Sequence, residues 1–275
     1  MLRVSLIILT VLFAVWLPHP PQATGAGTDQ EPAGGAPATA GGVLDIDPGR
    51  YGSIQHVRTP LPRRTIALTF DDGPDATRSG QVLDILDARD IKATFFYVGV
   101  YARMHPERVV ATARRGHNVA CHSWSHPTHL RSWSQSAQQS EVRRCFGALE
   151  AALAGEPPEV RARLEPMFRF PGLNEGPWLA GWLNSRGILV MSAEGGTDDW
   201  RGISSAEIHR RTLNVMEASD GGMLILHETR PNMIAALPGL LDELVARGFG
   251  FVQVTAGSEG RERALASEDA VLLSR

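Results

Sequence analysis

The chain alternates short apolar runs with longer stretches in which apolar residues recur every three or four positions. The short runs predict β-strands and the longer periodic stretches predict α-helices. The predicted strands cover residues 65–70, 93–98, 117–120, 167–170, 188–191, 223–226 and 250–254. The predicted helices cover residues 79–88, 106–115, 134–153, 177–186, 204–218 and 233–247.

Strands and helices take turns along the chain, and most of the strands are continuous apolar runs. Such runs are typical of parallel strands that are covered on both faces. About seven β–α units predict an α/β fold, a distorted (β/α) barrel with about seven parallel strands and the active site at the C-terminal strand ends. An open doubly wound sheet is the structural alternative.

The two ends of the chain lack this alternation. Arg3, an apolar run over residues 4–17 and the small residues after Pro18 form the pattern of a secretory signal peptide. We therefore expect a signal peptide over 1–25, a linker and lead-in over 26–62, the folded domain over 63–257 and a tail over 258–275.

The leader predicts an exported protein, periplasmic or secreted, without stable membrane insertion beyond the leader itself. An uncleaved membrane anchor is the alternative, although a transmembrane helix needs about 20 apolar residues. Cys121 and Cys145 are the two cysteines of the chain. An exported protein can pair them, and two buried thiols are the other reading that the sequence leaves open.

Composition narrows the classes of function. The 275 residues are 43% hydrophobic and 21% charged, which is ordinary for a globular fold. The formal net charge is −3, and no basic run interrupts the chain. No nucleic-acid partner is therefore expected.

Polar residues follow two of the predicted strands, at the edge where a parallel barrel holds its active site. Asp71 and Asp72 follow the first strand, and His122 and His126 follow the third. Histidines four residues apart can share one face of a helical turn and bind one metal. Asp72 with the two histidines would leave positions open for water and substrate, and Asp71 would then accept a proton.

Neither cluster is specific by itself. The aspartates can belong to a turn in which one of them caps a helix, and a four-residue spacing of histidines is only a weak signal for a metal site. Arg169 lies at the end of the fourth strand, where it can hold a carboxylate in a bidentate pair. A surface salt bridge is the alternative for this arginine. His227 follows the sixth strand, where a lone histidine is often a core residue.

In their order these residues resemble the motifs of the polysaccharide deacetylase family, the NodB-homology domain of carbohydrate esterase family four. Residues 69–74 read Thr-Phe-Asp-Asp-Gly-Pro and match its first motif, and residues 122–127 read His-Ser-Trp-Ser-His-Pro and match its second. The resemblance covers roughly residues 63–255 and implies the distorted barrel.

The resemblance implies a metal-dependent hydrolase that removes N-acetyl groups from an acetylated amino-sugar polysaccharide or oligosaccharide by attack of metal-bound water. The glycan partner would be peptidoglycan, a chitin-like polymer or an exopolysaccharide. The implied metal ligands are Asp72, His122 and His126, with zinc as the metal and cobalt or nickel as alternatives. Asp71 resembles the general base, Arg169 the arginine that holds it, and His227 the general acid.

The resemblance also implies substrate-binding residues, with two departures from the family pattern. Pro171 and Gly172 belong to the third motif, where a backbone N–H stabilises the oxyanion, but Gly172 replaces an aromatic residue and Leu173 a glycine. Leu226 and its strand neighbours resemble the apolar wall for the acetyl methyl group, and Trp200 would line the acetyl pocket.

The fourth motif lacks its first aspartate, because Gly196 stands in that place. That aspartate normally orients the general-acid histidine. Asp199, Asp198 or Glu194 can replace it, and the sequence does not choose among them.

Two other functions use the same residues. One is hydrolysis of O-acetyl esters on a glycan, and the other is a non-catalytic carbohydrate-binding scaffold. The complete set of catalytic residues argues against the scaffold, and the altered fourth motif is the one feature in its favour.

Overall fold

The structure is a computed structural model, and it describes residues 42–266. The predicted signal peptide, residues 26–41 of the predicted linker and residues 267–275 of the predicted tail lie outside these residues. None of the helices within residues 42–266 is long and apolar enough to cross a membrane.

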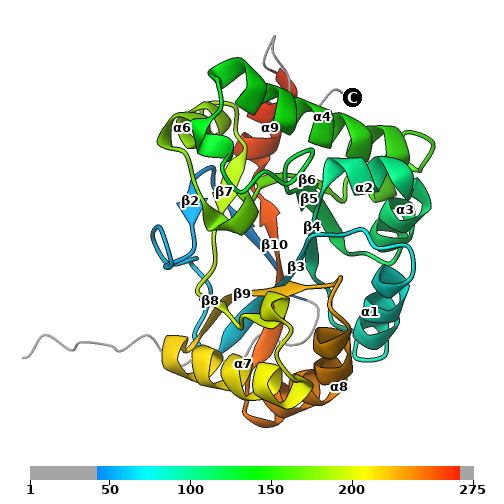
Figure 1. The fold of residues 1–275 in the computed structure, drawn as a ribbon, viewed down its shortest axis with the longest axis vertical. Helices are drawn as coiled ribbons and strands as arrows, with labels where there is room; N and C mark the ends of the chain where they lie inside the picture. The colour runs from blue at the N-terminus through cyan, green and yellow to red at the C-terminus, as the bar shows by residue number, and fades with distance from the viewer. Residues whose placement is uncertain (1–41, 267–275) are drawn as a thin grey trace, which may run out of the picture. The chain divides into compact units, whose positions relative to one another are not determined.

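All seven predicted strands form, and they pair in parallel within one sheet. They are β3 (Thr65–Asp71), β4 (Thr94–Tyr97), β5 (Asn118–Cys121), β6 (Leu164–Phe168), β7 (Leu189–Met191), β9 (Gly221–His227) and β10 (Gly250–Ala256). From β9 the order runs through β3, β4, β5 and β6 to β7 (Figure 1). The sheet curls into a half-barrel, which confirms the predicted barrel architecture.

Three further strands extend this sheet: β1 (Gly42–Ile46), β2 (Arg50–Tyr51) and β8 (Gly195–Gly196). They pair in parallel with β10, β7 and β9, respectively. β1 and β2 lie in the predicted lead-in, so this segment belongs to the sheet. Both are short and partly exposed, which leaves too little apolar alternation for a prediction from sequence.

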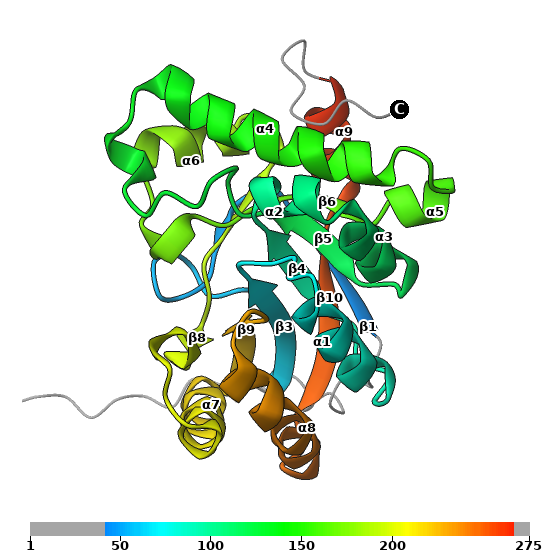
Figure 2. The same ribbon diagram turned by 45° about the vertical axis from the view of Figure 1, so that its right-hand side comes forward.

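Helices cover the outer face of the sheet, and the six predicted ones all form. They are α1 (Arg78–Asp87), α3 (Pro106–Arg114), α4 (Gln135–Leu153), α6 (Pro177–Asn184), α7 (Ser205–Ser219) and α8 (Pro231–Ala246). Two short helices, α2 (Gly99–Met104) and α5 (Pro158–Arg161), were not predicted. Helix α4 lies at one end of the domain, and α7 and α8 pack together at the other (Figure 2).

The predicted tail begins with a helix that was not predicted, α9 (Ser258–Ala266). Arg261 of this helix pairs with the carboxylate of Glu165, which is buried in β6, and donates to the carbonyl of Ala256 at 3.0 Å. Because this partner lies about a hundred residues earlier in the chain, the local pattern of charged and small residues gave no sign of it.

The strands separate two apolar layers. Alternate side chains of each strand point into the barrel or outward to the helices, as the pleat requires. Ala67, Phe96, Met167, Met191 and Met223 belong to the inner layer. Polar side chains at the C-terminal ends of the same strands therefore converge above this inner layer, where the candidate site lies.

Candidate active site

The predicted metal ligands meet at the C-terminal ends of β3 and β5. Asp72 Oδ1 lies 3.6 Å from His122 Nε2 and 3.1 Å from His126 Nε2. One ligand atom from each of the three residues lies within 4.8 Å of the others. A single ion can therefore contact all three.

The four-residue spacing of the two histidines suggested a shared helical turn, but the structure does not contain one. Residues 122–126 form an irregular loop in which Ser123 has a φ of 66° and His126 a φ of 58°. Both values lie in the left-handed region, where non-glycine residues are strained and often functional. The Ser123 hydroxyl accepts the N–H of His126 at 3.0 Å and closes this loop.

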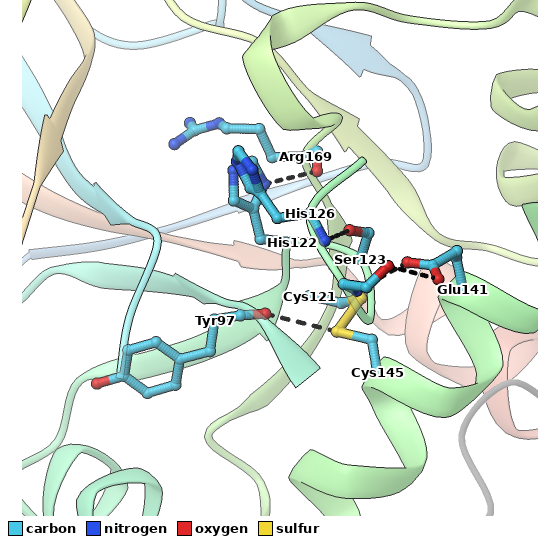
Figure 3. Close-up of a disulfide and its surroundings, with 9 residues drawn as sticks. Tyr97, Cys121, His122, Ser123, His126, Glu141, Cys145 and Arg169 are labelled. Carbon is cyan, nitrogen blue, oxygen red and sulfur yellow. Dashed lines mark hydrogen bonds between the residues drawn. A yellow bond between two sulfur atoms is a disulfide. The ribbon is translucent and has the colours of Figure 1, made fainter. Parts of the chain in front are cut away.

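Helix α4 holds the histidine loop in place (Figure 3). A disulfide joins Cys121, at the end of β5, to Cys145 of α4, with the Cα atoms 6.0 Å apart. The carboxylate of Glu141, one turn earlier on α4, accepts the N–H and the O–H of Ser125 at 2.8 and 2.9 Å. The structure thus pairs the two cysteines whose state the sequence left open.

His122 is prepared as a metal ligand. Its Nδ1 lies 2.8 Å from the carbonyl oxygen of Arg169 (Figure 3). A carbonyl only accepts, so Nδ1 carries the proton and Nε2 keeps its lone pair toward Asp72. Burial lowers the pKa of His122 below its ordinary value despite the nearby carboxylates, which keeps the ring neutral.

The carboxylate of Asp72 has the properties expected of a metal ligand. Its Oδ1 is buried and has no well-aligned hydrogen-bond donor among the described residues. Burial alone would raise the pKa of Asp72, but the interaction with His126 and the fields of His122 and His227 hold it well below its usual range. An ionised and unsatisfied oxygen beside two imidazoles suits a divalent metal.

Asp71 forms a buried ion pair with Arg169, so the surface ion pair considered for this arginine is wrong. The Nη1 of Arg169 donates to Asp71 Oδ1 at 2.6 Å. The contact is not bidentate, because Nη2 and Nε donate to the carbonyls of Ser192 and Met191 at 3.0 and 3.2 Å. The other carboxylate oxygen, Asp71 Oδ2, faces the triad at 3.7 Å from His122 Nε2.

The partner of His227 is Asp199. Its Oδ1 accepts from His227 Nδ1 at 2.8 Å, and its Oδ2 accepts the backbone N–H of His227 at 2.7 Å. Asp198 pairs instead with Arg211 at 2.7 Å, and Glu194 binds backbone N–H groups elsewhere. Of the three acids that the sequence left open, only Asp199 contacts the histidine in the described part of the chain.

His227 is held in a state suited to proton donation. Burial opposes its protonation, but the hydrogen bond to Asp199 and the charges of Asp199, Asp71 and Asp72 outweigh burial. The pKa of His227 is therefore raised above its ordinary value.

A cavity of about 850 Å³ brings the triad, Asp71, Asp199 and His227 together. Gly172 and Trp200 also line it, and Trp200 is 49% exposed. Pro171 is buried behind Gly172 and does not line this cavity.

Of Leu226 and its strand neighbours, which the resemblance assigned to the apolar wall, Leu226 itself does not line the cavity. Its side chain is fully buried in the outer layer between strand and helices, and Ile225 lines the cavity in its place. Neighbouring residues of a strand point to opposite faces, so an assignment displaced by one residue reverses the face.

A segment that the sequence analysis missed, residues 52–59, forms another wall of the cavity; we call it the strap. Ile54 lines the cavity and is 49% exposed. The buried carboxylate of Glu194 accepts the N–H groups of Ser53 and Thr59, at 3.2 and 2.7 Å, and that of Met223 in β9. These partners lie far apart in the chain, so no sequence signal pointed to them.

Glu175 fixes the middle of the strap. Its carboxylate pairs with His56 at 2.5 Å and also with Arg50. The side-chain amide of Gln55 donates to the carbonyl of Leu173. The strap is thus tied to the loop that carries Gly172.

Glu228, which the sequence also did not single out, lies beneath the loop that carries Asp72. Its Oε1 accepts from the Ser79 hydroxyl at 2.8 Å and from the N–H of Asp75 at 3.3 Å. Burial raises the pKa of Glu228 to about 8. A Cβ at Gly73 would lie 1.5 Å from this oxygen, so only glycine fits beside it.

The family model described as polysaccharide deacetylase matches residues 58–174, which include β3, the histidine loop and Gly172. Over these residues the resemblance of the chain to the polysaccharide deacetylase family is confirmed. The prediction of an enzyme of this class is thereby confirmed.

Curated relatives carry names that agree with this family. A peptidoglycan-N-acetylglucosamine deacetylase of Bacillus cereus is 29% identical over 198 residues, which make up 70% of this chain and 68% of the relative. The enzyme of that name from Listeria monocytogenes is 26% identical over 73% of this chain. The match spans 40% of that longer relative.

Solved structures share the fold. A peptidoglycan deacetylase of Bdellovibrio bacteriovorus superposes with a TM-score of 0.66 at 24% identity, covering 87% of this chain and 63% of the other. This likeness concerns the fold alone.

Proposed function

We propose that this deacetylase hydrolyses N-acetyl groups of amino sugars in peptidoglycan. The observation that carries the proposal is the arrangement around the triad. Asp71 on Arg169 and His227 on Asp199 open into one cavity with the three ligands. A base and an acid beside a metal site are what hydrolysis of an amide requires. The names of the relatives supply the choice of glycan.

Asp72, His122 and His126 would hold a divalent metal. Zinc suits two imidazoles and one carboxylate, with cobalt or nickel as alternatives. A bound ion of this kind polarises a carbonyl group and lowers the pKa of a water molecule. The unsatisfied Asp72 Oδ1 and the neutral His122 support this assignment.

Asp71 is the proposed general base. Arg169 occupies its Oδ1 and balances its charge, so Oδ2 is the oxygen that faces the triad. This oxygen would take the proton from the attacking water. His227 is the proposed general acid, because Asp199 fixes Nδ1 as the proton-bearing partner and leaves Nε2 to protonate the amine that departs.

Three lining residues complete the proposed site. The backbone N–H of Gly172 would stabilise the oxyanion that forms on the acetyl group. Ile225 offers an apolar contact for the acetyl methyl group, and the half-exposed ring of Trp200 a face for a sugar.

Acetate release tests this function. We expect the leaderless protein to release acetate from peptidoglycan and from N-acetylglucosamine oligomers, to lose activity when stripped of metal, and to regain it with zinc. Release from acetylated xylan alone would replace the amide reaction by ester hydrolysis. Glycan binding without any release would favour the non-catalytic scaffold.

The ligand assignment has its own test in His126→Ala. We expect this variant to lose zinc, measured by equilibrium dialysis, and to lose activity while its circular dichroism spectrum stays unchanged. His129→Ala is the matched control, because His129 is an exposed histidine outside the triad. Equal zinc content in His126→Ala and wild type would remove His126 from the site.

Export is part of the same proposal. The leader pattern supports it, and the Cys121–Cys145 disulfide suits an oxidising compartment. We expect cell fractionation to find the protein outside the cytoplasm. We expect its measured mass to be that of the chain without the leader. A membrane-bound protein of full mass would indicate an uncleaved anchor.

A further inference from the structure

A second cavity adjoins the first at the metal triad. Its volume is about 490 Å³, and its lining includes Arg78, Tyr101 and His105. Both cavities are lined by Asp72, His126 and Arg230. Arg230 therefore stands where the two spaces meet, three residues after His227.

Arg230 has no anionic partner among the described residues. No carboxylate of residues 42–266 forms an ion pair with it, and its Nε is buried without an acceptor. Leaving a buried hydrogen-bond donor without an acceptor costs free energy, so an unpaired donor in a native site indicates that a partner binds there.

The acidic groups of the second cavity do not meet this need. Asp75 Oδ2 is taken by Arg78 at 2.9 Å, and its Oδ1 accepts the N–H groups of Thr77 and Arg78 at 2.9 and 2.8 Å. Asp72 belongs to the metal triad. Arg230 is thus the cation of this cavity that is left for an external anion.

We propose that Arg230 binds a carboxylate that the substrate carries beside its acetamido group. This rests on the proposed function, because an acetamido carbonyl at the triad fixes where the rest of the sugar lies. In an amino sugar the acetamido group on C2 and the oxygen on C3 are neighbours. A substituent on that oxygen lies next to the triad, where Arg230 separates the two cavities.

The chemistry of this substituent selects the sugar. N-acetylmuramic acid carries a lactyl ether on the C3 oxygen that ends in a carboxyl group, whereas N-acetylglucosamine carries a neutral hydroxyl. A planar guanidinium recognises a carboxylate by charge-assisted hydrogen bonds and gains little from a hydroxyl. The preferred substrate is therefore a muramic acid residue, with either its free lactyl carboxylate or the carboxylates of an attached peptide at Arg230.

The test compares Arg230→Gln with wild type on three substrates: neutral N-acetylglucosamine oligomers, peptide-free glycan strands and strands that carry peptide. We expect kcat/KM on the carboxylated strands to fall by about tenfold or more, the effect of losing one charge-assisted hydrogen bond. On the neutral oligomers we expect a change within about twofold. The strand with the larger fall identifies the source of the carboxylate.

Arg78→Gln is the matched control, because it removes a cation of the same cavity that already has a partner. We expect it to leave the ratio of the two activities unchanged. Arg230→Lys should restore part of the preference, since it keeps the charge. An equal loss on neutral and carboxylated substrates, or no loss on either, would overturn the proposal.

Binding separates this proposal from the proposed reaction. In a metal-loaded His227→Ala background, N-acetylmuramic acid should bind more tightly than N-acetylglucosamine, and Arg230→Gln should remove the difference. This result can be obtained even if wild type releases no acetate from any glycan. Equal affinities with Arg230 present would contradict carboxylate recognition.

Discussion

Arg169 is among the largest side chains of the described chain that have no exposed surface. Its guanidinium lies 4.0 Å from the centre of the Phe96 ring and donates to Asp71, Thr69 and two carbonyls. These contacts compensate for the lost hydration of both charges. They also fix the orientation of the proposed base.

Removal of this arginine is expected to destabilise the protein. Arg169→Ala leaves the Asp71 carboxylate buried without its cation, which typically costs about 3–5 kcal/mol. We expect urea denaturation to show a loss of this order in the free energy of unfolding. Arg131→Ala, at an exposed arginine, should change it by less than about 0.5 kcal/mol, and similar losses in both would contradict the buried pair.

The contact between Asp199 and His227 predicts a pH effect. As the proposed general acid, His227 would act in its protonated form, so activity should be lost as the pH rises through its pKa. Asp199 contributes to raising that pKa. Asp199→Asn removes the negative charge and should lower the pKa, which moves the alkaline limb of the kcat profile to lower pH. An unchanged alkaline limb would assign it to another group.

At the scale of elements, the site depends on helices that carry none of its proposed chemistry. Helix α4 holds the histidine loop through Cys145 and Glu141 (Figure 3). Helix α9 covers Glu165, whose pKa burial raises to about 7 although Arg261 opposes the rise. These helices supply partners to groups that the strands bury.

Helix α9 should contribute a pH-dependent share of stability. Arg261→Ala removes the cation beside Glu165, whose folded-state pKa then rises further above its unfolded value. Stability linked to a raised pKa is lost as the pH rises, so the variant should lose about 3 kcal/mol of unfolding free energy at pH 8.5. The loss should be smaller at pH 5, where Glu165 is protonated.

Denaturation at the two pH values checks this expectation. Arg263→Ala is the control, because Arg263 lies on the same helix and pairs with an exposed glutamate, Glu259. Such surface pairs contribute about 0–1 kcal/mol. A pH-independent loss in Arg261→Ala would show that Glu165 does not titrate as described.

At the scale of the whole domain, contacts between distant parts of the chain close the cavity. The strap reaches across to Glu194 and Glu175, more than a hundred residues later. β3 pairs with β9 along its whole length, so Asp71 lies beside His227, which comes more than 150 residues later in the chain, while β10 pairs with the other end of β3, at residues 65–67. The disulfide between Cys121, at the end of β5, and Cys145 of α4 adds a covalent link between the sheet and this helix.

Reduction of the disulfide should destabilise the whole domain. The bond closes a loop with a sequence separation of 24, and such bonds typically contribute about 2–4 kcal/mol. We expect a reducing agent to lower the urea midpoint of the wild type and to leave that of Cys145→Ser unchanged. A wild-type midpoint that is insensitive to reduction would mean that the bond adds no stability.

The fold could be predicted from local pattern to a large extent. Seven strands and six of the nine α-helices of residues 42–266 could be predicted from the apolar runs and repeats of their own residues. The strands β1 and β2 and the helix α9 could not, because their partners rather than their own residues stabilise them. β9 is a continuous apolar run, and such a run does not show which side chains face the barrel interior, so the sequence could not show that Ile225 rather than Leu226 lines the cavity.

The sequence by itself determined the class of fold, the resemblance to the family and the identity of the triad, because these depend on residue type, order and spacing within short segments. Tertiary structure decided which acid orients His227, which strand face lines the cavity, how the cysteines pair and where the strap lies. Each of these depends on a distance between residues far apart in the chain. Such distances are fixed only when the barrel closes and buried polar groups select their partners.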